Sequence, residues 1–589
     1  MTSPSGTDFK QHSENVARRF LQTIVVVDDR AYFQPSELLL KPTEPLKSPS
    51  RPRFTGAPEL APEREEEFDI GDETEEESSR EMAAPVIERA DTAEETSEDL
   101  AHVLDAKYLI ESFAERGMVC AVLRPLEFEV EGLDRKVYRV AERSDIMMLD
   151  WVLHEDTEGK KVTELIVEMT RKASEQHRLR LIVIYTAELE LVGIIEKVEN
   201  SLKTAGISDV SKKDDFTIVS GPVRIVVYGK YNVSGTSLGD ELKKRLVPTD
   251  QIPDRVINEF AKMTGGLVSN VALSSLAAMR SNTHRILSKF NPDVDAPFLS
   301  HRAMLPRPEE ASNLLVHLIG TEMTAVLEGN EVGKTAEESA GLDVIKAWIE
   351  SNEASGYKFA DRFGVKDSPN VLVQLNTLLH KGVGDAALQG NFKSFKNSPH
   401  KRNLTEKLCP SSKSASDLEH KFAVLTTLKS DYRSESNPPA LFPGALLKET
   451  LSADESEKSF KYWVCIQPMC DCVRIEVTRS FPLLELEQAA DNGKFEIVLP
   501  EGKSFVHMNV VYRPYRSRME DFDPSTDSSM MVRGNFLADG IYFTAKNGTH
   551  YKWIGDLRFE QAQRIANKYA AELSRVGLNE SEWLRRWAL

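Results

Sequence analysis

Short apolar runs recur along the first 240 residues, and polar positions bound each of them. The runs are rich in aliphatic and β-branched side chains and are as short as buried strands usually are. They are Thr23–Val27, Met118–Leu123, Ile146–Leu149, Leu181–Tyr185 and Val223–Tyr228. Helical spacing of apolar residues recurs between them, within 100–116, 162–173 and 187–205. Strands that alternate with helices predict an α/β fold, a doubly wound parallel sheet with helices on both faces.

The hydrophobic pattern changes after residue 240. Residues 241–432 have mainly helical spacing, for example within Ala311–Leu327, and predict a mainly helical domain. Residues 433–458 are rich in Pro and Ser and are typical of a linker. Residues 459–589 combine short alternating runs with a final helical stretch, Arg558–Leu578. This last part predicts a small antiparallel β domain with a C-terminal helix, which is a small α+β region.

Residues 41–98 interrupt the first domain, which we assign to residues 1–240. The insert is rich first in Pro and Ser and then in Glu, and its aromatic residues are Phe54 and Phe68. Such a stretch cannot bury enough apolar surface to offset its ordering entropy, so we expect it to be disordered. We interpret it as a solvated linker, and the alternative is an acidic tether that binds a partner or masks a basic site.

The net charge of the chain is concentrated in this insert. The whole chain has 74 Lys and Arg against 93 Asp and Glu, a net charge of −19. Residues 61–100 contain 17 acidic residues and 3 Arg, so they carry 3 − 17 = −14. The rest of the chain carries −19 + 14 = −5. Because a general nucleic-acid surface is strongly basic, we consider nucleic acid an improbable partner.

Composition also bears on the compartment of the protein. No apolar run reaches the roughly 18 residues that a membrane helix needs, and Met1–Phe20 lacks the apolar core of a signal peptide. Five cysteines in 589 residues do not form a disulfide framework. We therefore expect a cytoplasmic protein that does not bind the membrane.

Polar residues follow four of the predicted strands at the point where each strand ends. These residues are Asp28 and Asp29, then Asp150, then Thr186, then Lys230. Ligands of doubly wound sheets gather beyond the carboxyl ends of the strands, so we expect these side chains to converge. Clustered carboxylates require a cation, and hard oxygen ligands suit Mg²⁺. A carboxylate beside that ion can accept a phosphoryl group, whose charge an ammonium and a hydroxyl then stabilise.

This set resembles the receiver domain of two-component response regulators. The resemblance covers about residues 20–240 and rests on the following segments: Ile24–Asp29, Asp145–Trp151, Thr186 with the small Ala187, and Val226–Lys230. It implies a flavodoxin-like fold with a five-stranded parallel sheet. It also implies a phospho-acceptor, a phosphoryl-binding hydroxyl and a pairing ammonium, which are Asp150, Thr186 and Lys230. The implied magnesium ligands are Asp28, Asp29, Asp150 and the backbone carbonyl of Val152.

The sequence departs from the family pattern near the predicted ammonium. The family's aromatic switch residue usually stands three positions before the lysine, and this chain has Val227 there. Tyr228 is displaced by one residue, so we expect the usual coupling between Thr186 and an aromatic side chain to be altered. The insert also separates the acidic pair from the first helix of the resemblance.

The C-terminal half shows no catalytic motif that we can identify. Gly329–Thr335 has three rather than four residues between its glycines and follows a helical stretch, so we reject it as a phosphate-binding loop. A zinc site is conceivable at a cysteine cluster with one further ligand, namely Cys465, Cys470 and Cys472 with Cys409, His420 or His507. We favour buried small hydrophobes instead. The basic stretch 392–402 contains two aromatic residues, and we favour a solvated loop over a nucleic-acid contact.

Cys465–Cys472 resembles a piece of large atypical receiver proteins from bacterial defence operons. There, such proteins accompany a sensor histidine kinase and a separate effector, and a receiver without an output drains phosphoryl groups as a sink. We therefore expect a phospho-accepting protein of a phosphorelay, with Mg²⁺ as cofactor and a kinase as partner, and without a catalytic output of its own. Two alternatives remain. One is an effector whose C-terminal half has an unrecognised activity, such as cleavage of nucleic acid or nucleotides, and the other is a scaffold with a degenerate receiver.

Overall fold

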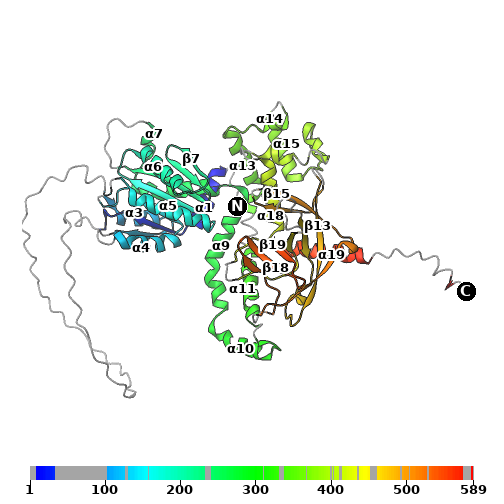
Figure 1. The fold of residues 1–589 in the computed structure, drawn as a ribbon. Helices are drawn as coiled ribbons and strands as arrows, with labels where there is room; N and C mark the ends of the chain where they lie inside the picture. Colours follow the sequence, from blue (N-terminus) through cyan, green and yellow to red (C-terminus); the bar gives the residue numbers. More distant parts are fainter. Residues whose placement is uncertain are drawn as a thin grey trace, which may run out of the picture. The chain divides into compact units, whose positions relative to one another are not determined.

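In the computed structural model the chain forms two compact units, Met1–Ser355 and Gly356–Leu589 (Figure 1). The structure describes residues 8–33, 103–125, 130–154, 156, 158–231, 240–308, 311–329, 337–365, 368–397, 401, 403–409, 414–433, 437–450, 460–490, 494–502, 504–526, 530–574 and 586–587. The predicted disordered insert and the rejected glycine loop lie outside these residues, the loop except for Gly329. None of the helices in the described ranges is long and apolar enough to span a bilayer.

A parallel sheet forms the centre of the first unit. Five parallel strands lie in the spatial order β4 (Val119–Leu123), β1 (Thr23–Val27), β5 (Ile146–Leu149), β6 (Arg180–Thr186) and β9 (Val223–Lys230). Each predicted apolar run thus overlaps one of these strands, and β6 and β9 extend beyond their runs. The four inner runs are buried on both faces, and this explains why they read as continuous apolar stretches rather than alternating ones.

The sheet is larger than the predicted five strands. A hairpin of β7 (Val210–Asp214) and β8 (Thr217–Ser220) adds two antiparallel strands beyond β9, and β10 (Leu246–Val247) pairs in parallel with the end of β9. The full sheet therefore has eight strands. β7 has mostly exposed polar side chains, as edge strands often do, so it carried no apolar signal.

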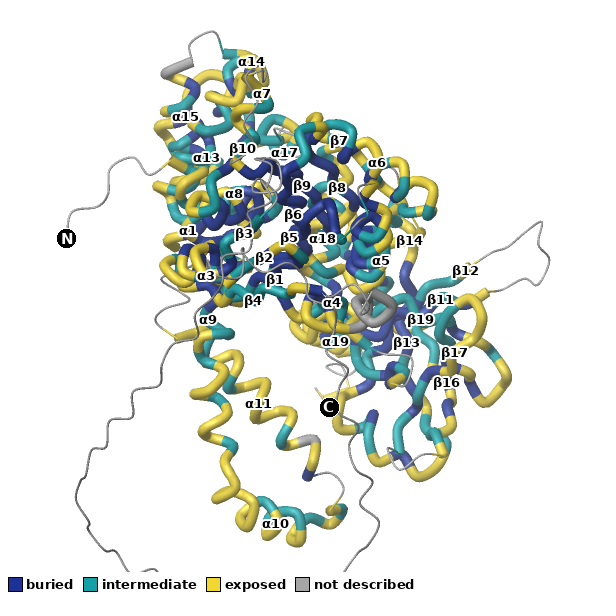
Figure 2. The backbone as a smooth tube through the Cα atoms, turned by 90° about the vertical axis from the view of Figure 1, so that its left-hand side faces the viewer, coloured by how far each residue is buried: buried dark blue, intermediate teal, exposed yellow. Residues whose placement is uncertain are grey.

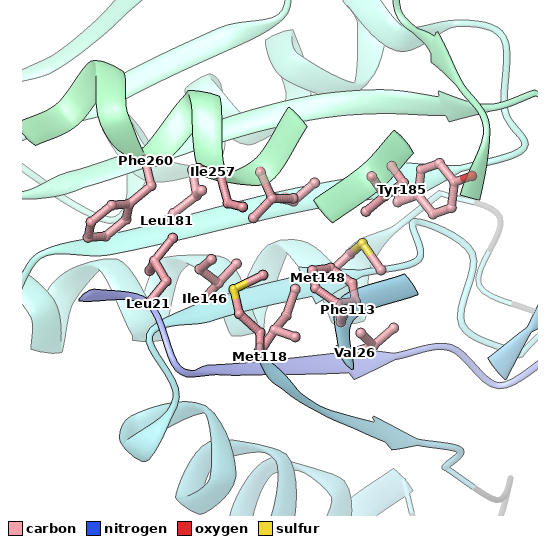
Figure 3. Close-up of a cluster of buried hydrophobic side chains, with 14 of the residues drawn as sticks. Leu21, Val26, Phe113, Met118, Ile146, Met148, Leu181, Tyr185, Ile257 and Phe260 are labelled. Atoms are coloured by element: carbon pink, nitrogen blue, oxygen red, sulfur yellow. The ribbon is translucent and has the colours of Figure 1, made fainter. Parts of the chain in front are cut away.

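Helices cover both faces of this sheet. One face is covered by α1 (Phe9–Phe20), α3 (Ala106–Ala114) and α8 (Ile252–Thr264), and the other by α4 (Val130–Arg143), α5 (Lys160–Glu175) and α6 (Leu191–Thr204). The inner strands and helix faces are the buried parts of this unit (Figure 2). Alternate strand residues point to opposite faces, so each strand contributes to both cores. Figure 3 shows the first core, where Phe113 of α3 and Ile257 and Phe260 of α8 pack over Met148 and Leu181.

The first core continues past residue 240, where we placed the end of the first domain. α8 and the first half of α9 (Leu267–Lys289) contribute buried side chains to the same cluster as the sheet. On α9, the Arg280 guanidinium donates to Asp145 Oδ1 over 2.9 Å and to the Phe20 carbonyl over 2.7 Å. Asp145 also accepts from the backbone N–H groups of Gln22 and Thr23. These bonds fasten α9 to the amino end of the sheet. The remaining α-helices that the structure describes in this unit are α7 (Asp240–Lys243), α10 (Asp295–Met304), α11 (Ala311–Glu328) and α13 (Leu342–Ala354).

Short helices begin the second unit. They are α14 (Phe359–Phe363), α15 (Ser368–Lys381), a 3₁₀ helix (Gly390–Lys396), α17 (Leu404–Leu408) and α18 (Ala415–Thr427). Residues 241–432 are thus mainly helical where they are described, although the division between the units falls within them. Phe392 and Phe395 of the basic stretch are buried, and Phe392 stacks on Phe363 with ring centroids 4.7 Å apart. Our prediction of a solvated loop was therefore wrong for these aromatics, which form the core beneath the lysines.

An antiparallel sheet of nine strands forms the rest of the second unit. Eight strands lie in the order β14 (Ile497–Glu501), β15 (Ser504–Val510), β13 (Arg479–Gln488), β12 (Phe460–Cys465), β11 (Ala445–Thr450), β19 (His550–Asp556), β18 (Gly540–Thr544) and β17 (Asn535–Leu537). β16 (Arg518–Phe522) pairs with β13. α19 (Phe559–Leu573) follows the last strand and buries Ala562 and Ile565.

The predicted linker at 433–458 contains an inner strand of this sheet. β11 pairs with β12 on one side and with β19 on the other, and it buries four of its six residues. The Pro and Ser residues that indicated a linker flank Ala445–Thr450 rather than interrupt it. The linker prediction is therefore corrected here, because six residues between turn-forming segments are enough for a strand.

Candidate functional site

The five polar residues at the strand ends lie at one edge of the first sheet. The register pairs Val27 with Leu149, Leu149 with Ile184, and Thr186 with Gly229. Asp28, Asp150 and Lys230 therefore all lie at or directly after the carboxyl ends of neighbouring strands. This is the arrangement that the apolar runs predicted, and it follows from the parallel direction of the strands.

Lys230 bridges two of the carboxylates. Its Nζ donates to Asp28 Oδ2 over 2.9 Å and to Asp150 Oδ2 over 2.8 Å. The side chains are 4%, 2% and 1% exposed for Lys230, Asp28 and Asp150. Ion pairs this deeply buried keep their charges only when the partners satisfy one another. The bridge therefore holds three chain segments, 202 and 80 residues apart in sequence, at one point.

The electrostatics of this triad follow from its burial. Burial alone would lower the pKa of the Lys230 ammonium, but Asp28 and Asp150 raise it above its ordinary value. Burial raises the pKa of Asp28 above its ordinary value, Lys230 opposes that rise, and Asp150 adds to it. One ammonium thus pairs with two carboxylates, so the buried site carries excess negative charge. A second positive charge would neutralise that excess.

Asp29 is held by the loop that follows Asp150. Its Oδ2 accepts from the backbone N–H of His154 over 2.7 Å, and its side chain is 9% exposed. Asp29 Oδ1 and Asp150 Oδ1 are buried and have no hydrogen-bond partner. An unpaired buried carboxylate oxygen is costly, and these two are hard ligands of the kind that Mg²⁺ takes. The residues thus fit a divalent cation.

The arrangement of the carboxylates is not closed around an ion. In the described parts of the chain no three His, Cys, Asp or Glu side chains are grouped closely enough to hold one. Asp28 is occupied by Lys230 and by the backbone N–H of Arg30, which donates to its Oδ1 over 2.9 Å. A cation here would therefore draw on Asp29, Asp150, the backbone carbonyl of the buried Val152 and water. Magnesium characteristically keeps several waters when it binds.

Thr186 and Ala187 lie beside this triad at the end of β6. Thr186 is fully buried, and its Oγ1 accepts a hydrogen bond from the backbone N–H of Glu188 over 3.2 Å. Ala187 is 5% exposed, so the small side chain is itself enclosed. The predicted phosphoryl-binding role of Thr186 stays a prediction. Its hydroxyl hydrogen can still be donated, because the bond from the Glu188 N–H uses only a lone pair of Oγ1.

The tyrosines near the site point away from Thr186. Val227 packs in the core under α5 and α6, whereas Tyr228 packs in the opposite core. The Tyr228 hydroxyl donates to Glu259 Oε1 of α8 over 3.0 Å. The Tyr185 hydroxyl donates to the Val247 carbonyl of β10 over 2.9 Å. The displacement of the aromatic residue by one position thus moves it to the other face of the sheet.

The α8 carboxylate that receives Tyr228 is part of a buried charge network. Glu259 Oε2 also accepts from Arg224 Nε over 2.8 Å, and Lys262 Nζ donates to Oε1 over 2.6 Å. Burial alone would raise the pKa of Glu259, but Lys262 and Arg224 lower it below its ordinary value. The network joins β9, which ends at Lys230, to α8.

Sequence reasoning missed two features of this edge of the sheet. His154 stands four residues after Asp150, and a lone histidine in a loop gives no signal by itself. A cavity of about 320 Å³ opens beside Lys230 and is lined by Tyr32, Tyr108, Tyr185 and Tyr231 among others. These tyrosines come from four separate segments, so spacing in the sequence could not have indicated them.

The cysteine cluster of the second unit is partly a core feature. Cys465 and Cys472 are buried in one hydrophobic cluster, while Cys470 is exposed. Burial raises the pKa of Cys465 to about 12, which keeps it a thiol at neutral pH. For these two residues the interpretation as small hydrophobes is confirmed. His420 and His507 contact each other instead, with their Nε2 atoms 2.7 Å apart.

Comparison with known protein families matches residues 20–235 to the response receiver domain. No curated protein and no solved structure matches the chain. The matched residues contain the acidic pair, Asp150, Thr186 and Lys230, together with the five parallel strands that place them. Residues 20–235 of this chain are therefore a response receiver domain.

Proposed function

We propose that this protein accepts a phosphoryl group on Asp150 from a sensor histidine kinase, with Mg²⁺ as the cofactor. A receiver domain supports a phospho-accepting, response-regulator role in general. The observation that carries the proposal is the bridge of Lys230 between Asp28 and Asp150 at the carboxyl edge of the sheet. It leaves Oδ1 of Asp150 buried without a hydrogen-bond partner, as is Oδ1 of the neighbouring Asp29.

The chemistry of the transfer follows from these groups. A carboxylate oxygen of Asp150 forms the new bond to phosphorus, and the bond from phosphorus to the kinase imidazole breaks, with its electron pair returning to that nitrogen. Lys230 then moves from the carboxylate to the phosphoryl oxygens, and the Thr186 hydroxyl donates to another of them. Bound Mg²⁺ supplies positive charge for the equatorial oxygens.

The proposal gives the protein no catalytic output of its own. It rests on the sequence, whose C-terminal half shows no catalytic motif that we can identify. In this view the chain regulates a kinase or drains phosphoryl groups as a sink, and bacterial antiviral defence is the setting that the Cys465–Cys472 resemblance suggests. A separate effector would then carry the response. Co-expression with an active kinase should leave cells viable, and toxicity that depends on Asp150 would favour the effector alternative.

Phosphoryl labelling tests the proposal directly. The full chain is incubated with acetyl phosphate, or with its kinase, and the acyl phosphate is detected by intact mass and by gel retardation. We expect labelling that requires a divalent cation and is lost in Asp150→Asn. The matched control is Asp156→Asn, a loop carboxylate that accepts from the Lys161 N–H at the start of α5 over 2.7 Å. Equal labelling of wild type and Asp150→Asn would refute the proposal, as would no labelling of either.

A further inference from the structure

Two long helices of the first unit run away from the sheet and bury very little. α9 and α11 lie side by side and lead to α10, as Figure 2 shows. Between Ala278 and Leu327, Ala311 is the one buried residue among those that the structure describes. Helices in proteins draw most of their stability from an apolar face that packs against other elements. This helical hairpin contains such a face, but the face is exposed.

The apolar residues on the outer part of α9 form one stripe. They recur at alternating steps of three and four residues, the spacing of a helix face that packs along another helix. The stripe consists of Leu276, Met279, Thr283, Ile286 and Phe290. It lines a groove of about 760 Å³ between α9, α11 and the amino end of the sheet, and α11 contributes Ile319 and Met323. Leu276 and the adjoining Leu287 are 54% and 63% exposed, so the groove is open to an occupant.

The stripe is symmetric in sequence about Thr283. Met279 and Leu287 each stand four residues from it, and Leu276 and Phe290 each stand seven residues from it. An antiparallel second α9 with a two-fold axis at Thr283 therefore brings Met279 of one copy to Leu287 of the other, and Leu276 to Phe290. Thr283 meets its own counterpart, and its small side chain allows the helix axes to approach closely. A two-fold interface needs a surface that is complementary to itself, and this stripe meets that requirement.

The charges at the two ends of the groove also fit an antiparallel copy. His177 and Arg178 line the groove at its base, beside the sheet. Asp293 and Asp295 are exposed and lie just before and at the start of α10, at the far end of the hairpin. The antiparallel arrangement places the acidic end of one hairpin at the basic base of the other. Such complementarity fixes the orientation of two partners.

The hairpin is also large enough for a stable dimer. A standard interface takes about 20–30 residues from each partner. α10 and α11 contain 10 and 18 residues, and one side of these helices together with the outer part of α9 supplies about 20. Two hairpins packed in this way place four helices around one apolar core, which a single hairpin cannot enclose.

We propose that the occupant of the groove is a second copy of this chain, so that α9 and α11 of two chains form a four-helix dimer interface. The two α9 helices are antiparallel and cross at Thr283. This inference does not rest on the proposed phosphoryl transfer. The groove lies at the amino end of the sheet, whereas Asp150 and Lys230 lie at its carboxyl end.

Sedimentation velocity of the full chain, with and without a charge on the stripe, tests the surface. Interfaces of standard size dissociate at micromolar concentrations or below, so the protein is measured from about 1 to 100 μM. The variant is Leu287→Glu, and the matched control is Val373→Glu on α15, where the valine is 60% exposed. Both side chains are exposed in a single copy, so both variants should fold. We expect dimers of the wild type and of Val373→Glu. Leu287→Glu should weaken association at least about a hundredfold, because two-fold symmetry buries the charge twice.

Disulfide formation tests the two-fold axis itself. Thr283→Cys is compared with Arg285→Cys, both in a Cys470→Ser background, because Cys470 is the exposed cysteine of the chain. Position 283 faces its counterpart at the axis, within reach of a disulfide, whereas position 285 points about half a turn away on the same helix. We expect a covalent dimer under mild oxidation from Thr283→Cys alone. A wild-type chain that stays monomeric at the highest concentration, undiminished association of Leu287→Glu, or equal cross-linking at the two positions would overturn the proposal.

Discussion

The Lys230→Met substitution tests the central physical claim about this site. Methionine approximates the length of the lysine stem but removes the ammonium, so Asp28 and Asp150 remain buried without their shared cation. Removing one partner of a buried ion pair typically costs about 3–5 kcal/mol, because the remaining charge is neither solvated nor paired. At a tenfold change for each 1.4 kcal/mol, the sheet should open between about a hundredfold and a few thousandfold more often.

Hydrogen–deuterium exchange of the amides in β1, β5 and β9 measures that opening, because these buried strands exchange only when the sheet unfolds. The matched control is Lys203→Met. Its Nζ lies 2.7 Å from Glu199, as close as the buried pairs, but its side chain is 55% exposed. Solvent screens such a pair, so we expect a change below about 1 kcal/mol. Similar exchange in the two variants would refute the reasoning, since burial is then not what gives the bridge its strength.

The loss of stability in Lys230→Met should also depend on pH. The pKa of Asp28 is raised by burial, and Lys230 is the group that opposes the rise. A carboxyl whose pKa is raised in the folded state adds stability at low pH, and that stability is lost as the pH rises through its folded pKa. Without Lys230 the pKa should rise further. The deficit of Lys230→Met should therefore be largest near neutral pH and shrink as the pH falls towards the ordinary carboxyl range.

Three further predictions concern the surroundings of the site and the second unit. Gly159→Ala should destabilise the first unit by more than about 1 kcal/mol in thermal unfolding, because a Cβ there would lie 2.2 Å from the Trp151 ring. The control is Gly206→Ala. Gly206 has a similar φ but open space around it, so this substitution should destabilise the unit less. Glu259→Gln should lower the free energy of unfolding by about 1–3 kcal/mol at neutral pH. The difference from wild type should vanish as the pH falls through the lowered pKa of Glu259. Denaturation at several pH values measures this difference. Phe392→Ala should cost about 3–5 kcal/mol and speed exchange around the 3₁₀ helix, because a buried stacked ring is lost; an unchanged exchange rate would mean that the ring is not part of a core.

The displaced Tyr228 affects which elements of the domain are linked to the strand ends by hydrogen bonds. Tyr228 is bonded to Glu259, and Tyr185 to the Val247 carbonyl, both on the face that α8 covers. Val227, at the position where the family usually has its aromatic switch residue, lies in the opposite core and has no hydroxyl to offer. The polar links from the strand ends thus run towards α8 and β10 rather than towards Thr186.

The sequence by itself determined the parallel strands and the residues at their ends. A strand buried on both faces is mostly apolar, so β1, β5, β6 and β9 are visible as apolar runs, although Arg224 interrupts the run in β9. Once the strands are parallel, their carboxyl ends share one edge, and the positions of Asp28, Asp150 and Lys230 follow. That inference needs no knowledge of the loops between the strands.

Only the tertiary structure decided which groups complete the site and where the units end. The edge strand β7 and the strand β11 are too polar or too short to stand out in the sequence, and their partners define them. The place of His154 against Asp29 depends on one left-handed residue in a loop. Contacts between segments more than a hundred residues apart depend on how the whole chain packs, and local propensity carries no information about them.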